Sequence, residues 1–308
     1  MAALTQAAAA VGAEPAAGRP RRRGGLVPLV LLAPALTWLV VFFVVPTISL
    51  ASQSLQTGDI DNGFILTWNV ATYADAMARY WPQFLRSILY AASATLGTLL
   101  LGYPLAWFIA HRSGRWKNTL LVLVVAPFFT NFLIRTLAWQ IILTDNGPVT
   151  GFFRATGLTN VLQAVGLTEN NSLLGSQFAV ICGLIYNFLP FMVLPLYTIL
   201  ERLDTRLLDA AGDLYANGWN TFWKVIWPLS LPGVVSGTLL TFIPAAGDYI
   251  NSKLLGNTQT VMIGQVIDAQ FLRVLDYPIA AALSFILMAA IIVLVAGYVR
   301  AAGTEELV

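Results

Sequence analysis

The chain has 308 residues, of which 57% are hydrophobic and only 10% are charged, and its formal net charge is +2. Soluble globular domains carry about 25% charged residues, so this composition excludes that class and predicts an integral membrane protein. The mean hydropathy of +0.73 agrees with this prediction.

The N-terminal residues 1–25 are rich in Ala, Gly and Pro and end in an arginine cluster that includes Arg19 and Arg21. The apolar run that follows is too long for the core of a signal peptide, and no small-residue cleavage site closes it. We therefore expect a disordered cytoplasmic tail with a basic anchor. Nucleic-acid binding is the other interpretation of the arginines, but a positive-inside anchor explains them better, and no nucleic-acid partner is expected.

Six apolar runs are long enough to cross a bilayer, because a spanning helix needs about 20 residues. The alternating pattern of a transmembrane strand is absent, so the predicted fold class is all-α with six membrane helices. The predicted spans are 26–52, 84–110, 118–143, 177–200, 229–250 and 278–300. Residues 301–308 are expected to form a cytoplasmic C-terminal tail.

The distribution of Lys and Arg predicts the orientation of the spans. With both termini in the cytoplasm, 11 of the 17 basic residues lie on that side. These are Arg19, Arg21, Arg22, Arg23, Arg112, Arg115, Lys117, Arg202, Arg206, Lys224 and Arg300. The acidic residues, among them Asp145 and Asp248, gather on the outer side, where they could attract a cation.

The third predicted span carries Arg135 near its middle and Asn131 one helical turn earlier. A charge at membrane depth is costly, so we expect Arg135 to face the bundle interior and to find a carboxylate or backbone carbonyls. Two interpretations stay open: an element of a substrate pathway or gate, and a buried structural pair that fixes the helix register.

No catalytic or metal site is evident. The single cysteine, Cys182, cannot form an intrachain disulfide, and the single histidine, His111, has no partners for a metal. No phosphate-binding Gly-rich loop with a Gly-Lys-Ser/Thr ending occurs. The chain is therefore not expected to be an enzyme or to bind a cofactor, and energy for uphill transport has to come from a partner or an ion gradient.

Residues 201–228 form a polar interruption between two apolar runs, with an apolar face on each half. In the second half, Trp219, Phe222 and Trp223 recur at helical spacing, and Asn217-Gly218 marks a break before them. A helix with one apolar face just outside the bilayer is suited to docking into a partner. The alternatives are a helix that lies on the lipid surface and packing beneath the bundle.

The end of the fifth predicted span contains Pro244 and Gly247, followed by Asp248 and Tyr249. Proline frees a backbone carbonyl, so the helix is expected to kink or end there. Asp248 and Tyr249 would then lie at a broken helix end near a cavity. An ordinary interfacial Asp-Tyr pair is the alternative.

The loop resembles the EAA loop of ABC-importer permeases, through Asp209-Ala210-Ala211, Phe222 and Pro228 at the family spacing. Two positions differ from the pattern: Asp209 stands for the usual Glu, and Tyr215 for the usual Gly. Gly218, three residues later, is expected to take over the turn. The resemblance implies that this loop forms a coupling helix that seats in a cleft of an ATPase subunit.

Further blocks resemble the spermidine/putrescine branch of these permeases over about residues 26–300. They are Gly102-Tyr-Pro-Leu-Ala106, Pro127-Phe-Phe, Arg135-Thr, Ala138-Trp139, Asn146-Gly147, Gly247-Asp248-Tyr249, Leu254-Leu255-Gly256, Met262-Ile-Gly264, Gln270-Phe271 and Asp276-Tyr-Pro278. The resemblance implies a type I importer fold in the inner or plasma membrane. It also implies a second homologous permease subunit, two ATPase subunits and an external substrate-binding protein.

These observations predict a permease subunit for ATP-driven polyamine uptake. The expected ATPase-coupling residues are Asp209, Ala210, Ala211, Tyr215, Gly218, Trp219, Phe222 and Trp223, and the expected pathway residues are Asn131, Arg135, Asp145, Asp248 and Tyr249. An ABC permease for another small solute, an ion-coupled secondary transporter and a non-transporting scaffold are the alternatives. The ion-coupled class would favour inverted repeats and intramembrane acids, and neither pattern is evident.

Overall fold

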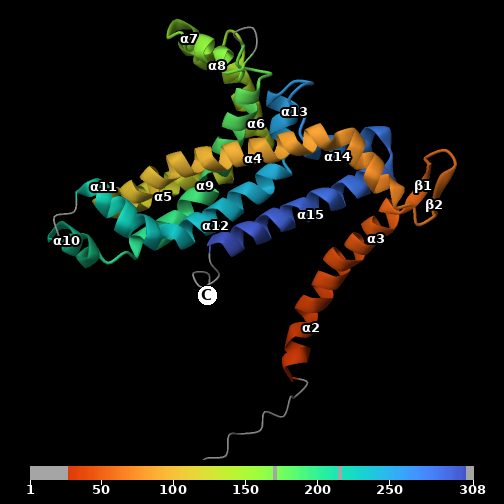
Figure 1. Ribbon diagram of the computed structural model, residues 1–308, viewed down its shortest axis with the longest axis horizontal. Coiled ribbons are helices and arrows are strands. Elements are labelled where there is room, and N and C mark those ends of the chain that lie inside the picture. Colours follow the sequence, from red (N-terminus) through yellow and green to blue (C-terminus); the bar gives the residue numbers. More distant parts are fainter. Residues whose placement is uncertain (1–26, 169–171, 214–216, 303–308) are drawn as a thin grey trace, which may run out of the picture. The chain divides into compact units, whose positions relative to one another are not determined.

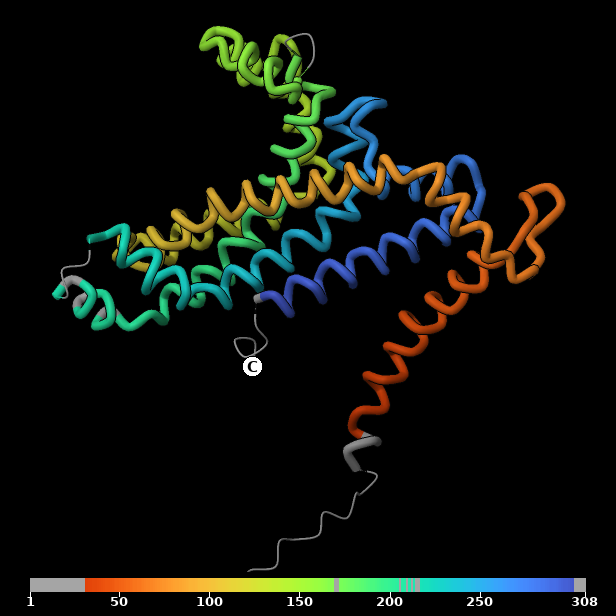
Figure 2. The backbone as a smooth tube through the Cα atoms, viewed as in Figure 1, coloured from red at the N-terminus to blue at the C-terminus, as the bar shows by residue number. Residues whose placement is uncertain are grey.

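The computed structural model describes residues 27–168, 172–213 and 217–302 (Figures 1 and 2). The predicted N-terminal tail and most of the predicted C-terminal tail fall outside these residues. The chain divides into two compact units, residues 1–49 and residues 50–308.

The described part of the first unit is helical. It consists of α2 (Val27–Leu39), the π-helical turn η1 (Val40–Val44) and α3 (Val45–Ser54). Pro46 cannot donate a backbone hydrogen bond to Phe42, and the helix widens just before it. Thr47 Oγ1 donates to the Phe43 carbonyl at 2.7 Å, which gives that carbonyl a side-chain partner.

A small β-hairpin follows, which the all-α expectation did not include. Strand β1 (Gln56–Asp59) pairs in antiparallel register with β2 (Gly63–Leu66). The Asp59 carboxylate accepts the backbone N–H groups of Asp61 at 3.0 Å and Asn62 at 2.7 Å, and Gly63 takes a positive φ of 81°. Asn62-Gly63 is a common hairpin turn pair, but β1 is polar, so apolar residues flank the turn only in β2.

Four long helices make the core of the second unit and run side by side in Figure 1. They are α4 (Ala71–His111), α9 (Gln177–Glu201), α12 (Trp227–Ala246) and α15 (Tyr277–Ala302). Helix α9 packs against α4 and α12, and α15 covers the other side of α4 and α12. Leu184, Met192 and Leu196 on α9 are fully buried in this core.

Helix α4 is longer than its predicted span of 84–110. Its 41 residues extend about 60 Å at 1.5 Å per residue, roughly twice the thickness of a hydrocarbon core. In the additional N-terminal part, Ala76 belongs to the same buried cluster as Ile263 of the short helix α14 (Ile263–Ala269). The π-helical turn η5 (Gln270–Val274) then leads into α15.

The predicted third span over 118–143 is broken in the structure. The 3₁₀ turn η2 (Gly114–Trp116), α5 (Lys117–Val125) and the 3₁₀ turn η3 (Ala126–Phe129) come first, and α6 (Phe132–Leu143) then leaves at an angle of 96°. Thr130 has an extended backbone, and the Asn131 side chain caps α6 by accepting the Leu133 N–H at 2.8 Å. Together with Pro127 these residues end one helix and start another, which apolar length alone could not reveal.

Two short helices, α7 (Pro148–Ala155) and α8 (Leu158–Ala164), continue from α6 and lie away from the core helices in Figure 1. Among the described residues, five helices are long and apolar enough to cross a membrane, or up to six if the bent pair counts as one span. The predicted helical membrane fold is therefore confirmed, with the third span broken.

Candidate coupling and substrate-pathway sites

The first half of the predicted coupling loop forms α10 (Thr205–Asp213). Its start is fixed by Asp204, whose carboxylate accepts the Arg206 N–H at 2.9 Å. The two predicted alanines lie on different faces of this helix: Ala210 is exposed, whereas Ala211 is only 9% exposed. Only Ala210 of the two is therefore open to contact by a partner. Asp209 lies in the helix, and Tyr215 lies outside the described residues.

The second half of the loop is helical, as expected, and it continues directly into the next long helix. The turn α11 (Gly218–Thr221) and the π-helical turn η4 (Phe222–Ile226) run directly into α12, so one helix extends from Gly218 to Ala246. Asn217 starts it, with its side chain accepting the Asn220 N–H at 2.8 Å. Gly218 has ordinary helical geometry, and the extended backbone of Asn217 precedes it.

The predicted apolar face of this half is shared between the interior and the surface. The Phe222 ring lies 5.6 Å from that of Tyr103 on α4 and belongs to the buried cluster there. Trp219 and Trp223 are 69% and 46% exposed. Phe222 therefore ties the loop to α4, and only the two tryptophans are available to another surface.

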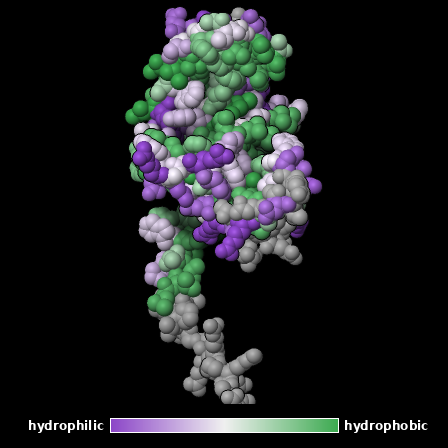
Figure 3. Space-filling model, turned by 90° about the vertical axis from the view of Figure 1, so that its left-hand side faces the viewer, coloured by the Kyte–Doolittle hydropathy of each residue, from purple (hydrophilic) through white to green (hydrophobic). Residues whose placement is uncertain are grey.

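An apolar groove of about 760 Å³ lies between this aromatic face and the C-terminal half of α4. Its lining residues include Leu99, Leu100, Tyr103, Pro104, Trp107, Leu208, Trp219, Phe222, Trp223 and Trp227. Seen from the end of the molecule that carries α10 and α11, hydrophilic and hydrophobic residues alternate in patches around the loop (Figure 3).

The two predicted residues of the third span lie at its break. Asn131 is the cap of α6, and its carbonyl accepts the Arg135 N–H at 3.1 Å. Arg135 Nη1 donates to the Pro127 carbonyl at 2.6 Å, which confirms the expected carbonyl partner. Its guanidinium carbon lies 6.0, 5.4 and 5.7 Å from the ring centres of Phe128, Phe132 and Tyr186.

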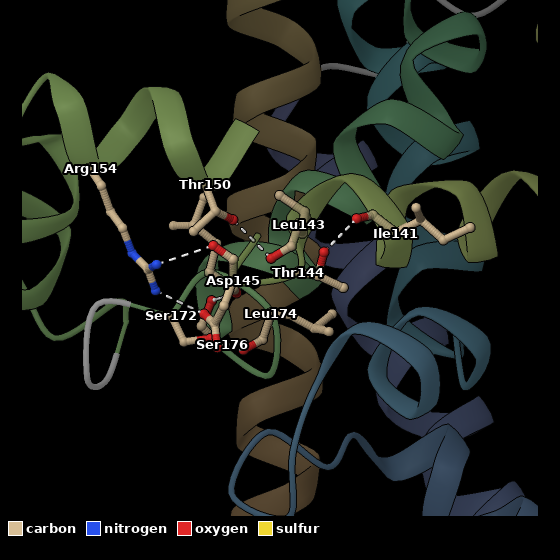
Figure 4. A network of polar contacts seen from close by, with 10 residues as sticks. Ile141, Leu143, Thr144, Asp145, Thr150, Arg154, Ser172, Leu174 and Ser176 are labelled. Atoms are coloured by element: carbon tan, nitrogen blue, oxygen red, sulfur yellow. Dashed lines mark hydrogen bonds and ion pairs between the residues drawn. The ribbon is translucent and has the colours of Figure 1, made fainter. Parts of the chain in front are cut away.

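Asp145 lies in the turn between α6 and α7, where it pairs with Arg154 (Figure 4). Arg154 Nη2 lies 3.0 Å from Asp145 Oδ1, and Nη1 donates to the Asp145 carbonyl at 3.1 Å. Both side chains are exposed, so the pair contributes no more than about 1 kcal/mol. Thr150 Oγ1 supports the same turn by donating to the Leu143 carbonyl at 2.9 Å.

Helix α12 ends at Ala246, as Pro244 and Gly247 predicted, and α13 (Ile250–Leu255) begins after Tyr249. Asp248 is only 8% exposed, so its carboxylate is buried in this structure. Its two oxygens accept the backbone N–H of Asn251 at 2.8 Å and the side-chain amide of Asn251 at 3.1 Å. Tyr249 is exposed.

The Asp248 carboxylate is buried, and Asn251 supplies both of its hydrogen bonds in the described part of the chain. None of the ion pairs between described residues includes Asp248. This position therefore holds a buried carboxyl group whose partners are the amide groups of Asn251.

The hydrogen bonds continue from Asp248 to the core helix α9. Asn187 Nδ2 donates to Asn251 Oδ1 at 3.0 Å, and Asn187 Oδ1 is buried with no hydrogen-bond partner in the structure. Two glycines permit the close packing. A Cβ at Gly183 on α9 would lie 2.8 Å from Asn251 Oδ1, and one at Gly264 would lie 2.4 Å from the Gly247 carbonyl oxygen.

Asn187, Asn251, Phe128, Phe132 and Tyr186 did not emerge from the sequence as site residues. An asparagine inside an apolar span is a usable signal, because a buried amide needs partners. No comparable signal marks the three rings, since aromatic residues are common throughout these spans.

Comparison with known proteins places the chain among membrane transport components. The model of the family described as binding-protein-dependent transport system inner membrane component matches residues 102–302. The spermidine/putrescine transport system permease protein PotB of Salmonella typhimurium is 38% identical over 260 residues, which cover 84% of this chain and 88% of that protein. PotB of Haemophilus influenzae is 34% identical over 88% of this chain and 93% of its own length.

A solved structure supports the fold. The bacterial ABC transporter involved in import of the acidic polysaccharide alginate contains a chain that matches 90% of this one with a TM-score of 0.61. That match covers 94% of the alginate transporter chain at 17% identity.

Proposed function

Because the chain belongs to the family of binding-protein-dependent transport system inner membrane components, we propose that it is a permease subunit for the ATP-driven uptake of polyamines. It works with a second homologous permease subunit, two ATPase subunits and an external substrate-binding protein. Both termini lie in the cytoplasm, and residues 26–300 form the transport domain.

The observation that carries the substrate class is the likeness to PotB proteins at 34–38% identity over more than four fifths of the chain. The chemistry at the end of α12 supports it. Spermidine and putrescine carry ammonium groups, which need acceptors when they leave water. The buried Asp248 carboxylate lies on residues that break a membrane helix, a location where transporters bind charged substrates.

We place the ATPase contact on α10, α11 and the start of η4. Ala210, Trp219 and Trp223 are exposed there, and a small residue beside large apolar rings suits seating in a cleft. Phe222 links this contact to α4 through Tyr103, and Tyr103 in turn bonds Ser230 on α12 at 2.8 Å. Movement of the loop is thereby passed to two core helices.

Purified complex tests this function. The chain, co-expressed with its partner subunits and reconstituted in nanodiscs, should hydrolyse ATP faster when the binding protein is loaded with spermidine or putrescine. Sulfate or a neutral sugar should give no stimulation. Stimulation by one of these solutes in place of polyamines would contradict the substrate assignment.

Cysteine labelling tests the orientation. Single cysteines at Ala210 and at Gly151, each introduced with Cys182→Ala, should react differently with an impermeant thiol reagent in intact cells. The cysteine at 151 should be labelled and the cysteine at 210 should be protected. Labelling of position 210 from outside would contradict the ATPase contact.

A further inference from the structure

We propose that Phe128, Phe132 and Tyr186 form an aromatic box for an alkylammonium group, and that the Arg135 guanidinium occupies this box in place of the substrate in the present structure. The identity of the ligand as a polyamine ammonium rests on the proposed function. The existence of the box rests on the geometry around Arg135 alone.

Three elements contribute the rings. Phe128 comes from the 3₁₀ turn η3, Phe132 from the first turn of α6, and Tyr186 from the core helix α9. Their ring centres lie 5.4–6.0 Å from the guanidinium carbon, within the range of cation–π attraction. Phe128 precedes the break in the third span and Phe132 follows it, so the bound cation lies at the bend.

The polar partners of Arg135 are few for a charge at this depth. The Pro127 carbonyl accepts from Nη1, but it also accepts from the Thr130 hydroxyl at 2.7 Å. Arg135 Nε is buried without a hydrogen-bond partner. In the described part of the chain, no carboxylate lies within ion-pair distance of Arg135. The rings therefore supply much of what holds this charge.

This chemistry is not specific for arginine. Aromatic boxes bind organic ammonium ions through the negative faces of the rings, and a free carbonyl accepts an ammonium N–H as readily as a guanidinium N–H. We expect the box to hold one cation at a time, since all three ring centres lie within 6.0 Å of one guanidinium carbon. Arg135 and a substrate ammonium would therefore exclude each other.

The box is also open to a ligand. Phe128 is 42% exposed, and Arg135 itself is only half-buried. The neighbouring Phe129 is 88% exposed and has no contact with the guanidinium among the cation–π pairs of the described residues, so it offers a control ring of the same type.

The test removes the internal cation from the assembled complex. Tetramethylammonium, which has no N–H, probes the box alone, and putrescine probes it as a substrate. Binding to the complex in nanodiscs, without the binding protein, is measured by saturation-transfer NMR. Arg135→Met should bind tetramethylammonium about tenfold more tightly than the wild type does, because an occupied box becomes free. Arg135→Gln is the second neutral variant.

The rings are then removed in the Arg135→Met background. Phe132→Leu should return tetramethylammonium binding to the wild-type level, whereas Phe129→Leu should leave the gain intact, and Tyr186→Phe should also keep it because the ring remains. Neutral variants that assemble without gaining affinity would overturn the proposal, as would equal effects of Phe132→Leu and Phe129→Leu.

Failure of both neutral variants to assemble would also overturn the proposal. It would show that Arg135 is needed to stabilise the break between η3 and α6. A box that binds tetramethylammonium but not putrescine, in a complex whose ATPase ignores polyamines, would locate the error in the proposed substrate and leave the box in place.

Discussion

Substitution of Gly183 on α9 should disturb the hydrogen-bonded residues Asp248, Asn251 and Asn187, because Gly183 lies where α9 packs against α13. A Cβ at this position would lie 2.5 Å from Leu255 Cδ1 and 2.8 Å from Asn251 Oδ1. Carbon atoms pack at about 3.5–4.0 Å, so α13 has to retreat by about 1 Å to admit even one methyl group. Gly183→Val adds two more carbons, and overpacking of this kind costs about 1–3 kcal/mol.

Gly297 provides the matched control, because it also lies inside a long core helix, α15, and nothing lies within 4 Å of a Cβ built there. Glycine and valine differ by only about 0.5 kcal/mol in helix propensity, so Gly297→Val should be nearly neutral. The thermal midpoint of the purified complex and the uptake of labelled putrescine are measured for both variants.

We expect Gly183→Val to lower the thermal midpoint and to reduce uptake at least about tenfold, since a shift of α13 away from α9 separates Asn251 from Asn187. Gly297→Val should match the wild type in both assays. Equal stability and equal uptake for the two variants would refute the view that the close approach of α9 and α13 builds the site.

Three further predictions concern charges and the coupling loop. Asp248→Asn should reduce polyamine uptake about tenfold to a hundredfold without loss of assembly. The control Asp268→Asn removes a partner of Lys253 and should leave uptake unchanged. Equal effects of the two substitutions on uptake would argue against a special role of Asp248 in transport. Ala210→Arg should leave assembly of the two permeases intact but abolish substrate-stimulated ATP hydrolysis, and wild-type coupling would exclude this face as the ATPase contact. Glu201→Gln breaks an exposed pair with Lys117 and should change the thermal midpoint only slightly, so a large loss would contradict its surface character.

Apolar length predicted the spanning helices because each core helix contains a continuous run of about 20 apolar residues. The same criterion missed the bend of the third span, since Phe128, Phe129 and Phe132 keep the run apolar through the break. The signal was local: Pro127 followed by Thr130-Asn131 is a helix stop followed by a cap. These residues therefore predict two helices in place of one continuous span.

The candidate site was predicted in part. Pro244 and Gly247 predicted the end of α12 and the location of Asp248 because their effects on the backbone are local. The link from Asp248 through Asn251 to Asn187 joins residues that are far apart in the chain, and it depends on which faces of α9 and α13 meet. Periodicity does not determine that pairing. The division of Ala210 and Ala211 between surface and interior likewise depends on how α10 packs.

Uptake by the complete transporter tests the central claim most directly. Proteoliposomes that contain this chain, its partner permease and the ATPases, with ATP inside, are given labelled putrescine and the binding protein outside. The account predicts accumulation against a gradient that requires both ATP and the binding protein and that unlabelled spermidine inhibits. Accumulation driven by an ion gradient in the absence of ATP, or no accumulation of any polyamine, would contradict it.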